Sequence, residues 1–145
     1  MAKFEIIVGS VLGASEYVAD ALQEVLIKHS HTADIHLAPQ LSDLDKNATW
    51  LICTSTHGAG DLPDNIQAFA QQLTSERLAE LKFLIVGLGD SSYDTFCQGA
   101  MQMEKIMSDA GAKLLFPALH IDVLHHPIPE DNAVAWMSNW LTTQA

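Results

Sequence analysis

Residues 50–65 read WLICTSTHGAGDLPDN, and their pattern decides the fold. The first five form a short apolar run, typical of a strand that is covered on both faces. The segment that follows is rich in glycine and short polar side chains, which favour a loop. Apolar side chains at helical spacing come after Pro63, at Ile66, Phe69 and Leu73. The stretch therefore predicts a strand, a loop at its carboxyl end, and a helix.

The same alternation runs through the rest of the chain. Further strand-like runs are FEIIV at 4–8, ADIHL at 33–37, FLIVG at 83–87 and LLFPALHI at 114–121. Helical patterns follow Ser15, extend from Phe96 to a cap at Gly111, and begin again at Pro129. Only residues 38–49 lack a clear helix between two strands. Five such strands predict an α/β domain, a parallel sheet and right-handed crossovers.

Length and charge limit the possible functions. A chain of 145 residues fits one domain, 1–145, and its 48% hydrophobic content is ordinary for a globular protein. The net charge of −11 argues against binding nucleic acid or an anionic membrane surface. Two interpretations of this charge stay open: plain solubility, or electrostatic guidance of a basic partner.

The segments around the cysteines indicate a cytoplasmic protein. The chain opens with MAKFEIIVGS, which enters a strand-like run at once, so we expect no export signal and no membrane span. Cys53 and Cys97 lie inside regular-looking segments. We therefore expect reduced thiols in the cytoplasm, and no disulfide frame.

The first loop, 9–16 (GSVLGASE), links the first strand to the first helix. It holds no lysine and lacks the three-glycine dinucleotide spacing, so it is neither a nucleotide P-loop nor a Rossmann turn. Two interpretations remain. It is either a turn of small residues with Ser15 as N-cap, or a phosphate site made of backbone N–H groups and hydroxyls.

The second loop, 55–65, and the third, 87–97 (GLGDSSYDTFC), follow the third and fourth strand-like runs. In the second, His57 is a catalytic base, a metal ligand or part of a pocket wall. No set of metal ligands surrounds it in the sequence. In the third, Tyr93 suits the face of a flat ring. Ligands in such folds bind beyond the carboxyl ends of strands. Together the loops fit a ligand with a phosphate and a flat polar ring, such as FMN.

These motifs resemble the short-chain flavodoxin-like FMN proteins, most closely the MioC group, over the whole chain. The resemblance implies a three-layer sandwich whose five-stranded parallel sheet has the order 2-1-3-4-5, with helices on both faces. One departure from the usual flavodoxin phosphate loop is Leu12 in place of threonine, and another is Ala14 in place of asparagine. The MioC-like pattern also has leucine there.

The resemblance also assigns the contacts with FMN. The phosphate falls to Ser10, Val11, Leu12, Gly13, Ala14 and Ser15, with Ser55 as a helper. His57 and the Gly58 peptide lie beside the inner face and N5 edge, Gly87, Leu88, Gly89 and Asp90 line the pyrimidine edge, and Tyr93 stacks on the outer face. The expected contacts extend to Thr56, Ala59, Gly60, Phe96 and Cys97.

The resemblance implies an electron carrier and not an enzyme. It would shuttle single electrons from a flavodoxin-type reductase to an iron–sulfur client such as biotin synthase, through partners with basic surfaces, as a monomer. Acids in the loops should steer such partners and make the reduced cofactor a stronger donor. Two alternatives stay open: a small flavin-dependent NAD(P)H reductase, and a non-redox interaction module with the flavodoxin fold.

Overall fold

The computed structural model describes residues 2–10, 13–56, 60–92 and 94–143. Its strands are β1 (Lys3–Gly9), β2 (Thr32–His36), β3 (Thr49–Thr54), β4 (Lys82–Gly89), β5 (Lys113–Leu114) and β6 (Leu119–Asp122). Its helices are α1 (Ala14–Lys28), α2 (Asp64–Leu73), α3 (Gln98–Asp109) and α4 (Pro129–Thr142), with a short 3₁₀ helix, η1 (Leu41–Asp43), in the connection for which no helix was expected.

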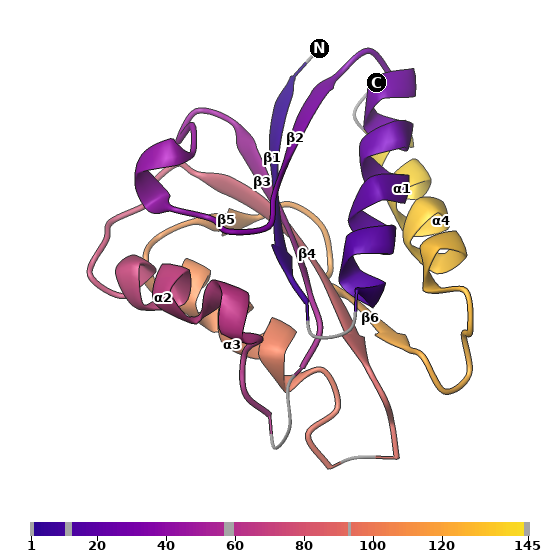
Figure 1. Cartoon of the computed structure of the whole chain (residues 1–145). Helices are drawn as coiled ribbons and strands as arrows, with labels where there is room; N and C mark the ends of the chain where they lie inside the picture. Colours follow the sequence, from indigo (N-terminus) through magenta and orange to yellow (C-terminus); the bar gives the residue numbers. More distant parts are fainter. Residues whose placement is uncertain (1, 11–12, 57–59, 93, 144–145) are drawn as a thin grey trace.

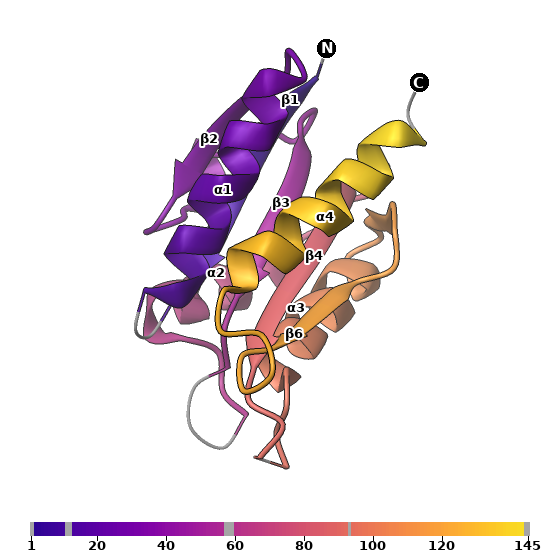
Figure 2. The same ribbon diagram turned by 90° about the vertical axis from the view of Figure 1, so that its right-hand side faces the viewer.

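A parallel sheet of order β2-β1-β3-β4-β5 lies between two layers of helices, which confirms the predicted fold class. Helices α1 and α4 cover one face, and α2 and α3 cover the other (Figures 1 and 2). Strands β1, β3 and β4 are almost entirely buried because both of their faces are covered. Their continuous apolar runs are therefore explained by position in the sheet.

The last strand-like run forms two short strands instead of one. β5 pairs with β4 at Phe83–Leu114, and β6 pairs with β4 from Val86–Leu119 onward. Leu119 lies five positions after Leu114, whereas Val86 lies only three positions after Phe83. The residues between Leu114 and Leu119 therefore leave the hydrogen-bonded ladder. Pro117 lies in this interval and has no backbone N–H to donate. Its carbonyl accepts the Trp136 indole N–H at 3.1 Å, which attaches the segment between β5 and β6 to α4.

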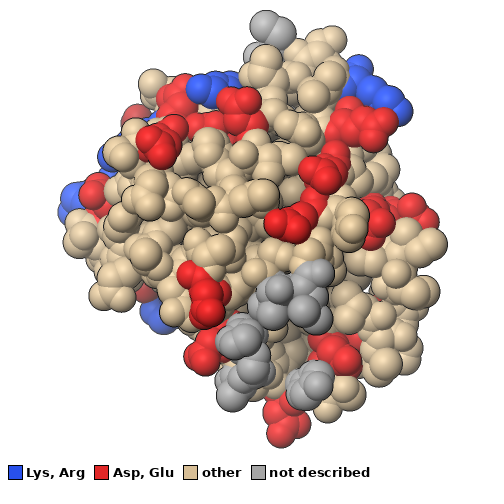
Figure 3. Space-filling view, viewed as in Figure 1, with Lys and Arg blue, Asp and Glu red and all other residues tan. Residues whose placement is uncertain are grey.

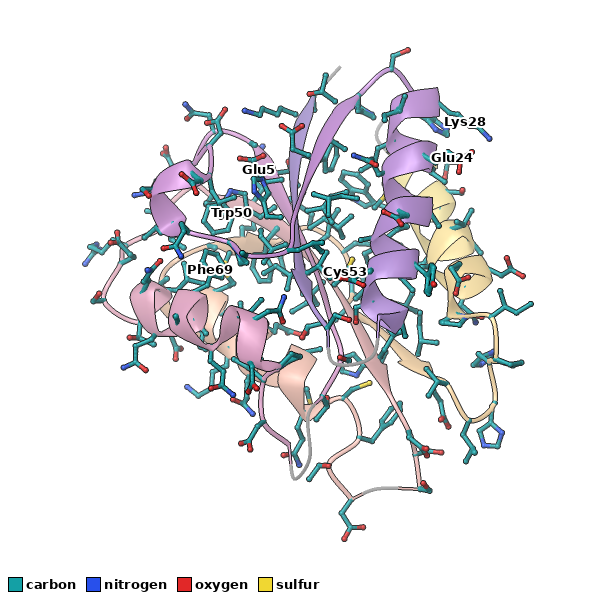
Figure 4. The ribbon with its side chains drawn as sticks, viewed as in Figure 1. Glu5, Glu24, Lys28, Trp50, Cys53 and Phe69 are labelled. Atoms are coloured by element: carbon teal, nitrogen blue, oxygen red, sulfur yellow. The ribbon has the colours of Figure 1, made fainter. Side chains whose placement is uncertain are left out.

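The connection from β2 to β3 is held by a buried acid. Glu5 on β1 is 2% exposed, and its carboxylate accepts the Asp45 N–H at 2.8 Å and lies 3.2 Å from His36 Nε2. Nearby, the rings of Trp50 and Phe69 pack together between the sheet and α2, tilted by 42° with centroids 6.0 Å apart (Figure 4). This segment therefore follows an ordered path although it lacks an α-helix.

Candidate functional site

Three loops meet at the carboxyl edge of β1, β3 and β4, at the lower end of the molecule in Figure 1. Backbone contacts join them. Ser55 donates its N–H to the Gly9 carbonyl at 3.0 Å, which links the second loop to the first. Gly99 in α3 donates its N–H to Thr56 Oγ1 at 3.0 Å, which links the second loop to the helix after the third. The structure thus brings together the described parts of the three predicted loops.

The start of α1 shapes the first loop. Gly13 has a left-handed φ of 90°, and its N–H is donated to Ser10 Oγ at 2.9 Å. Its carbonyl accepts the N–H groups of Glu16 and Tyr17, so Gly13, and not Ser15, is the N-cap residue. The interpretation of Ser15 as N-cap is wrong because the helix begins one residue before it, at Ala14.

The Ser15 side chain is a buried polar group left without a partner. Its Oγ is fully buried and has no hydrogen-bond partner among the described residues. Within the same part of the chain, no acceptor takes the N–H of Ala14 or Ser15, as is usual for the first turn of a helix. A buried hydroxyl and free N–H groups at the positive end of a helix dipole fit a phosphate group.

The second loop is fastened on both sides of residues 57–59. Before them, Thr56 Oγ1 accepts the Gly99 N–H; after them, the Gly60 carbonyl accepts a hydrogen bond from Gln102 Nε2. Gly60 has φ 105°, and a Cβ there would lie 2.5 Å from Gln98 Oε1. Helix α3 therefore sets the path by which the chain enters and leaves this segment.

The third loop begins later than expected. Gly87 and Leu88 were expected in the loop, but β4 continues through Gly89, and both residues are buried inside the strand. The glycines there make room for α3: a Cβ at Gly87 would collide with Ala100, and one at Gly89 would lie 2.8 Å from the Cys97 backbone N. Helix α3 therefore occupies the space beside these two glycines. Their contacts with FMN remain a prediction.

Asp90, Phe96 and Cys97 lie at the two ends of the third loop. Asp90 accepts hydrogen bonds from the Ser92 N–H and hydroxyl, at 2.9 and 2.6 Å. Phe96 is half-buried beside Gly89. Cys97 is fully buried, has φ 52° and is the N-cap residue of α3. These positions are compatible with a loop that binds a ring and is stabilised by hydrogen bonds between its own residues.

Asp122 is a site residue that sequence reasoning missed. It ends β6, and its Oδ1 accepts the N–H groups of Ser91 and Leu124, each at 3.1 Å. Its second oxygen lies 3.7 Å from His125 Nε2. The Ser91 side chain is the main cause that lowers the pKa of the Asp122 carboxyl, and the N–H groups of Ser91 and Leu124 add to this effect. The only signal in the sequence was an acid directly after the last apolar run.

Burial makes the two cysteines unreactive in the fold. Cys53 and Cys97 are both free and buried, as expected for reduced thiols. Burial raises the pKa of each thiol to about 12, and the Asp122 carboxylate adds to the effect at Cys97. In this fold neither is a nucleophile or a metal ligand at neutral pH.

The charge near the site is negative. None of the three loops contains lysine or arginine, whereas Asp61, Asp64, Asp90 and Asp94 lie in or directly beside them. In Figure 3 the basic side chains of the visible face lie along its upper and left margins, away from the lower end where the loops meet. Over the described residues, no group of three or more His, Cys, Asp or Glu is arranged to hold a metal. No described helix is long and apolar enough to cross a membrane.

Six of the predicted cofactor contacts lie outside the described residues: Val11, Leu12, His57, Gly58, Ala59 and Tyr93. Their assignments stay predictions. The described contacts that remain are those of the phosphate loop, the two anchors of the second loop and the ends of the third.

Comparison with known proteins identifies the family of this chain. The model of the flavodoxin family matches residues 6–136. The chain belongs to the flavodoxin family. Protein MioC of Escherichia coli (strain K12) is 40% identical to this flavodoxin over 143 residues, covering 97% of both chains. Flavodoxin YqcA of the same organism is 34% identical, covering 98% of both.

Solved structures agree. A cysteine-to-alanine variant of a flavodoxin from Pseudomonas aeruginosa superposes on this flavodoxin with a TM-score of 0.84 and 34% identity, covering 95% of both chains. Oxidised flavodoxin 1 from Bacillus cereus has a TM-score of 0.86 at 20% identity, which supports the fold alone. Flavodoxins bind FMN and carry electrons; they are not enzymes. This flavodoxin is accordingly an FMN-binding electron-transfer protein.

Proposed function

We propose that this flavodoxin takes single electrons from a flavodoxin-type reductase and delivers them to a client redox enzyme. It acts as one domain, as a monomer and in the cytoplasm, where its free buried cysteines stay reduced. When bound, FMN supplies the one-electron chemistry. The residues of the three loops supply position, exclusion of water and charge.

The observation that carries the proposal is the buried hydroxyl of Ser15, which has no hydrogen-bond partner among the described residues. A buried polar group without a partner costs free energy, and a ligand that accepts its hydrogen bond removes that cost. The FMN phosphate suits this position because Ser15 lies in the first turn of α1, where N–H groups point outward from the helix. We assign the phosphate to residues 10–15, with Ser55 beside them.

The ring of the cofactor belongs between the second and third loops. We propose the Gly58 peptide and His57 for its inner side and Tyr93 for its outer side, as the family resemblance implies. Asp90 and Gly89 then take the pyrimidine edge. The attachment of Thr56 and Gly60 to α3 supports this arrangement, because it fixes the second loop beside the end of the third.

The partners are proposed from charge and from resemblance. A chain of net charge −11, with acids around the three loops and no lysine or arginine in them, favours partners with a basic surface. An iron–sulfur client such as biotin synthase is inherited from the resemblance to the MioC group. Electron transfer to the true client should slow as salt is added, because salt screens attraction between exposed charges. A rate independent of salt contradicts this steering.

Cofactor binding is tested with Ser15→Ala. The control is Ser108→Ala, since Ser108 is an exposed serine near the C-terminal end of α3, away from the three loops. We expect Ser15→Ala to weaken FMN binding about ten-fold or more, since hydrogen bonds to charged groups contribute about 1.5–3 kcal/mol. The same change should leave the flavin-free protein at least as stable, because no described residue bonds the removed hydroxyl. Fluorescence titration and urea unfolding measure the two effects. Equal FMN affinity in Ser15→Ala and Ser108→Ala would disprove the assignment.

To test whether the protein is an electron carrier, the FMN-loaded protein is mixed with NADPH or NADH, with and without a flavodoxin reductase. We expect NADPH or NADH alone to leave the absorbance of the FMN-loaded protein unchanged, and a catalytic amount of a flavodoxin reductase to bleach it. Direct bleaching by either nucleotide identifies a flavin-dependent reductase instead. A colourless protein that ignores added FMN identifies an interaction module.

A further inference from the structure

Asn65 joins three segments at the edge of the sheet. It is the second residue of α2, and its side-chain oxygen, Oδ1, accepts the Ser10 N–H at 3.1 Å. Its amide nitrogen, Nδ2, donates to the carbonyls of Val8 at 2.6 Å and Leu37 at 2.9 Å. One side chain thus holds the end of β1, the start of the first loop and the segment after β2.

The side-chain amide of Asn65 makes the hydrogen bonds to β1 that a peptide group of β2 would make if that strand were longer. The pairing of β1 with β2 ends at Ile7 and His36, whereas its pairing with β3 continues to Gly9 and Thr54. Beyond Ile7, the carbonyl of Val8 and the N–H of Ser10 have no β2 residue opposite them. Asn65 supplies one acceptor and one donor there, as a longer β2 would do. The last turn of β1 into the first loop is therefore fixed by α2.

The three contacts admit only one orientation of the amide. Oδ1 faces an N–H, and Nδ2 faces two carbonyls, so a flipped amide would place an oxygen against both carbonyls. Aspartate has the same shape but no donor, so it would meet the carbonyls of Val8 and Leu37 with a negative charge. The position therefore requires asparagine for its hydrogen bonding and not merely for its size.

The contact with Ser10 leads directly to the phosphate loop. Asn65 holds the backbone of Ser10, and the Ser10 hydroxyl accepts the N–H of Gly13. Gly13 is the N-cap residue of α1 and precedes Ala14 and Ser15, whose N–H groups no described acceptor takes. We propose that Asn65 is a positioning residue for the FMN phosphate, which it orients through Ser10. This inference rests on the proposed assignment of the phosphate to the first loop.

The effect can be separated from a loss of folding. Asn65 is exposed, while the neighbouring Ile66 supplies the apolar packing of the first turn of α2. Truncating Asn65 to alanine therefore opens no cavity in the core. Gln71→Ala is the matched control, because Gln71 is an exposed amide on the same helix with no side-chain hydrogen bond to any described residue.

The test compares FMN with riboflavin, which has the same ring but no phosphate. Fluorescence titrations are made on Asn65→Ala, Asn65→Asp and Gln71→Ala. We expect Asn65→Ala to weaken FMN binding about ten-fold, or about 1.4 kcal/mol, because Ser10 loses the hydrogen bond that holds its backbone. Asn65→Asp should weaken it at least as much, and Gln71→Ala not at all. Riboflavin binding should change less than about two-fold in every variant. An equal loss for both flavins, or no loss for FMN, overturns the inference.

Two further measurements complete the test. The rise in melting temperature that inorganic phosphate gives the flavin-free protein should be smaller in Asn65→Ala than in Gln71→Ala; an equal rise counts against the inference. Ser15→Ala separates the two proposals. If Ser15→Ala lowers the ratio of FMN to riboflavin affinity and Asn65→Ala does not, only the role of Asn65 fails. If Ser15→Ala leaves the ratio unchanged, the assignment of the phosphate to the first loop fails.

Discussion

The backbone N–H of Gly99 in α3 is donated to Thr56 Oγ1 at 3.0 Å, across 43 positions of the chain. A Cβ at Gly99 would lie 2.7 Å from the Ser55 carbonyl oxygen and 3.3 Å from Thr56 Cα. Both atoms belong to the backbone of the second loop. Helix α3 therefore approaches that loop to a distance that only glycine allows.

Gly99→Ala should accordingly displace the second loop. We expect FMN binding to weaken several-fold and the free energy of unfolding to fall by about 1–3 kcal/mol, the usual cost of overpacking. Gly111→Ala is the control: its φ of 98° makes alanine unfavourable by roughly 1–2 kcal/mol, but it lies after the far end of α3. Urea unfolding and FMN titration of both variants measure the effects. If both lose stability and neither loses FMN affinity, the packing at Gly99 does not shape the site.

Asp122 should stabilise the protein in a manner that depends on pH. Because the pKa of this carboxyl is lowered in the folded state, its stabilisation is present above its unfolded value of about 3.9. It is lost as the pH falls through the folded-state pKa. Asp122→Asn keeps an oxygen that accepts the N–H groups of Ser91 and Leu124 but removes the charge. The urea midpoints of the wild type and Asp122→Asn should therefore differ near pH 6 and converge below pH 4. A difference that stays constant with pH contradicts this prediction.

The two thiols should resist modification in the folded protein. With a pKa of about 12, each is almost entirely protonated at pH 8, and burial keeps reagents away. We expect no alkylation of Cys53 or Cys97 by iodoacetamide at pH 8 over the time in which the urea-unfolded chain reacts fully. Mass spectrometry of the alkylated protein measures this. Fast labelling of Cys97 in the native state would show that the start of α3 opens.

The acids beside the loops should lower the last reduction potential of the cofactor. Reduction adds negative charge, and a carboxylate about 10 Å away in a water-like dielectric makes this less favourable by about 0.4 kcal/mol, or ~20 mV for one electron. Replacing Asp61, Asp64, Asp90 and Asp94 by asparagine should raise the potential by a few times that amount. Glu24→Gln is the control, since Glu24 pairs with Lys28 near the other end of α1 (Figure 4). Equal potentials in the control and the fourfold variant, measured by redox titration, would refute the idea.

The strands and helices could be predicted because their signals are local. The apolar run 50–54 forms β3 with one further residue, and the helical spacing from Ile66 to Leu73 lies within α2. The end of β4 could not be predicted in this way, because Gly87 and Gly89 look like loop residues. They are in fact strand residues that make room for Ala100 and Cys97. Only the packing of α3 on the sheet explains them.

The supporting residues of the site were beyond sequence reasoning for a related reason. The side chain of Asn65 binds Val8 and Ser10, which lie 57 and 55 positions away, and Asp122 binds Ser91 across 31. A polar residue at the start of a helix or the end of a strand is ordinary, and nothing in its spacing indicates a distant partner. The loops themselves were found because glycine and serine mark them locally.

The buried hydroxyl of Ser15 makes the rate at which this protein is degraded depend on the supply of riboflavin. A ligand that binds only the folded chain stabilises it by about 2.7 kcal/mol when its concentration is 100 times Kd. Flavin-free chains lack that contribution, and their buried Ser15 oxygen has no partner in the described part of the chain, so they unfold more often and are cleaved first by proteases. In a cell with little riboflavin, the abundance of this carrier should therefore fall by degradation, without any change in its synthesis.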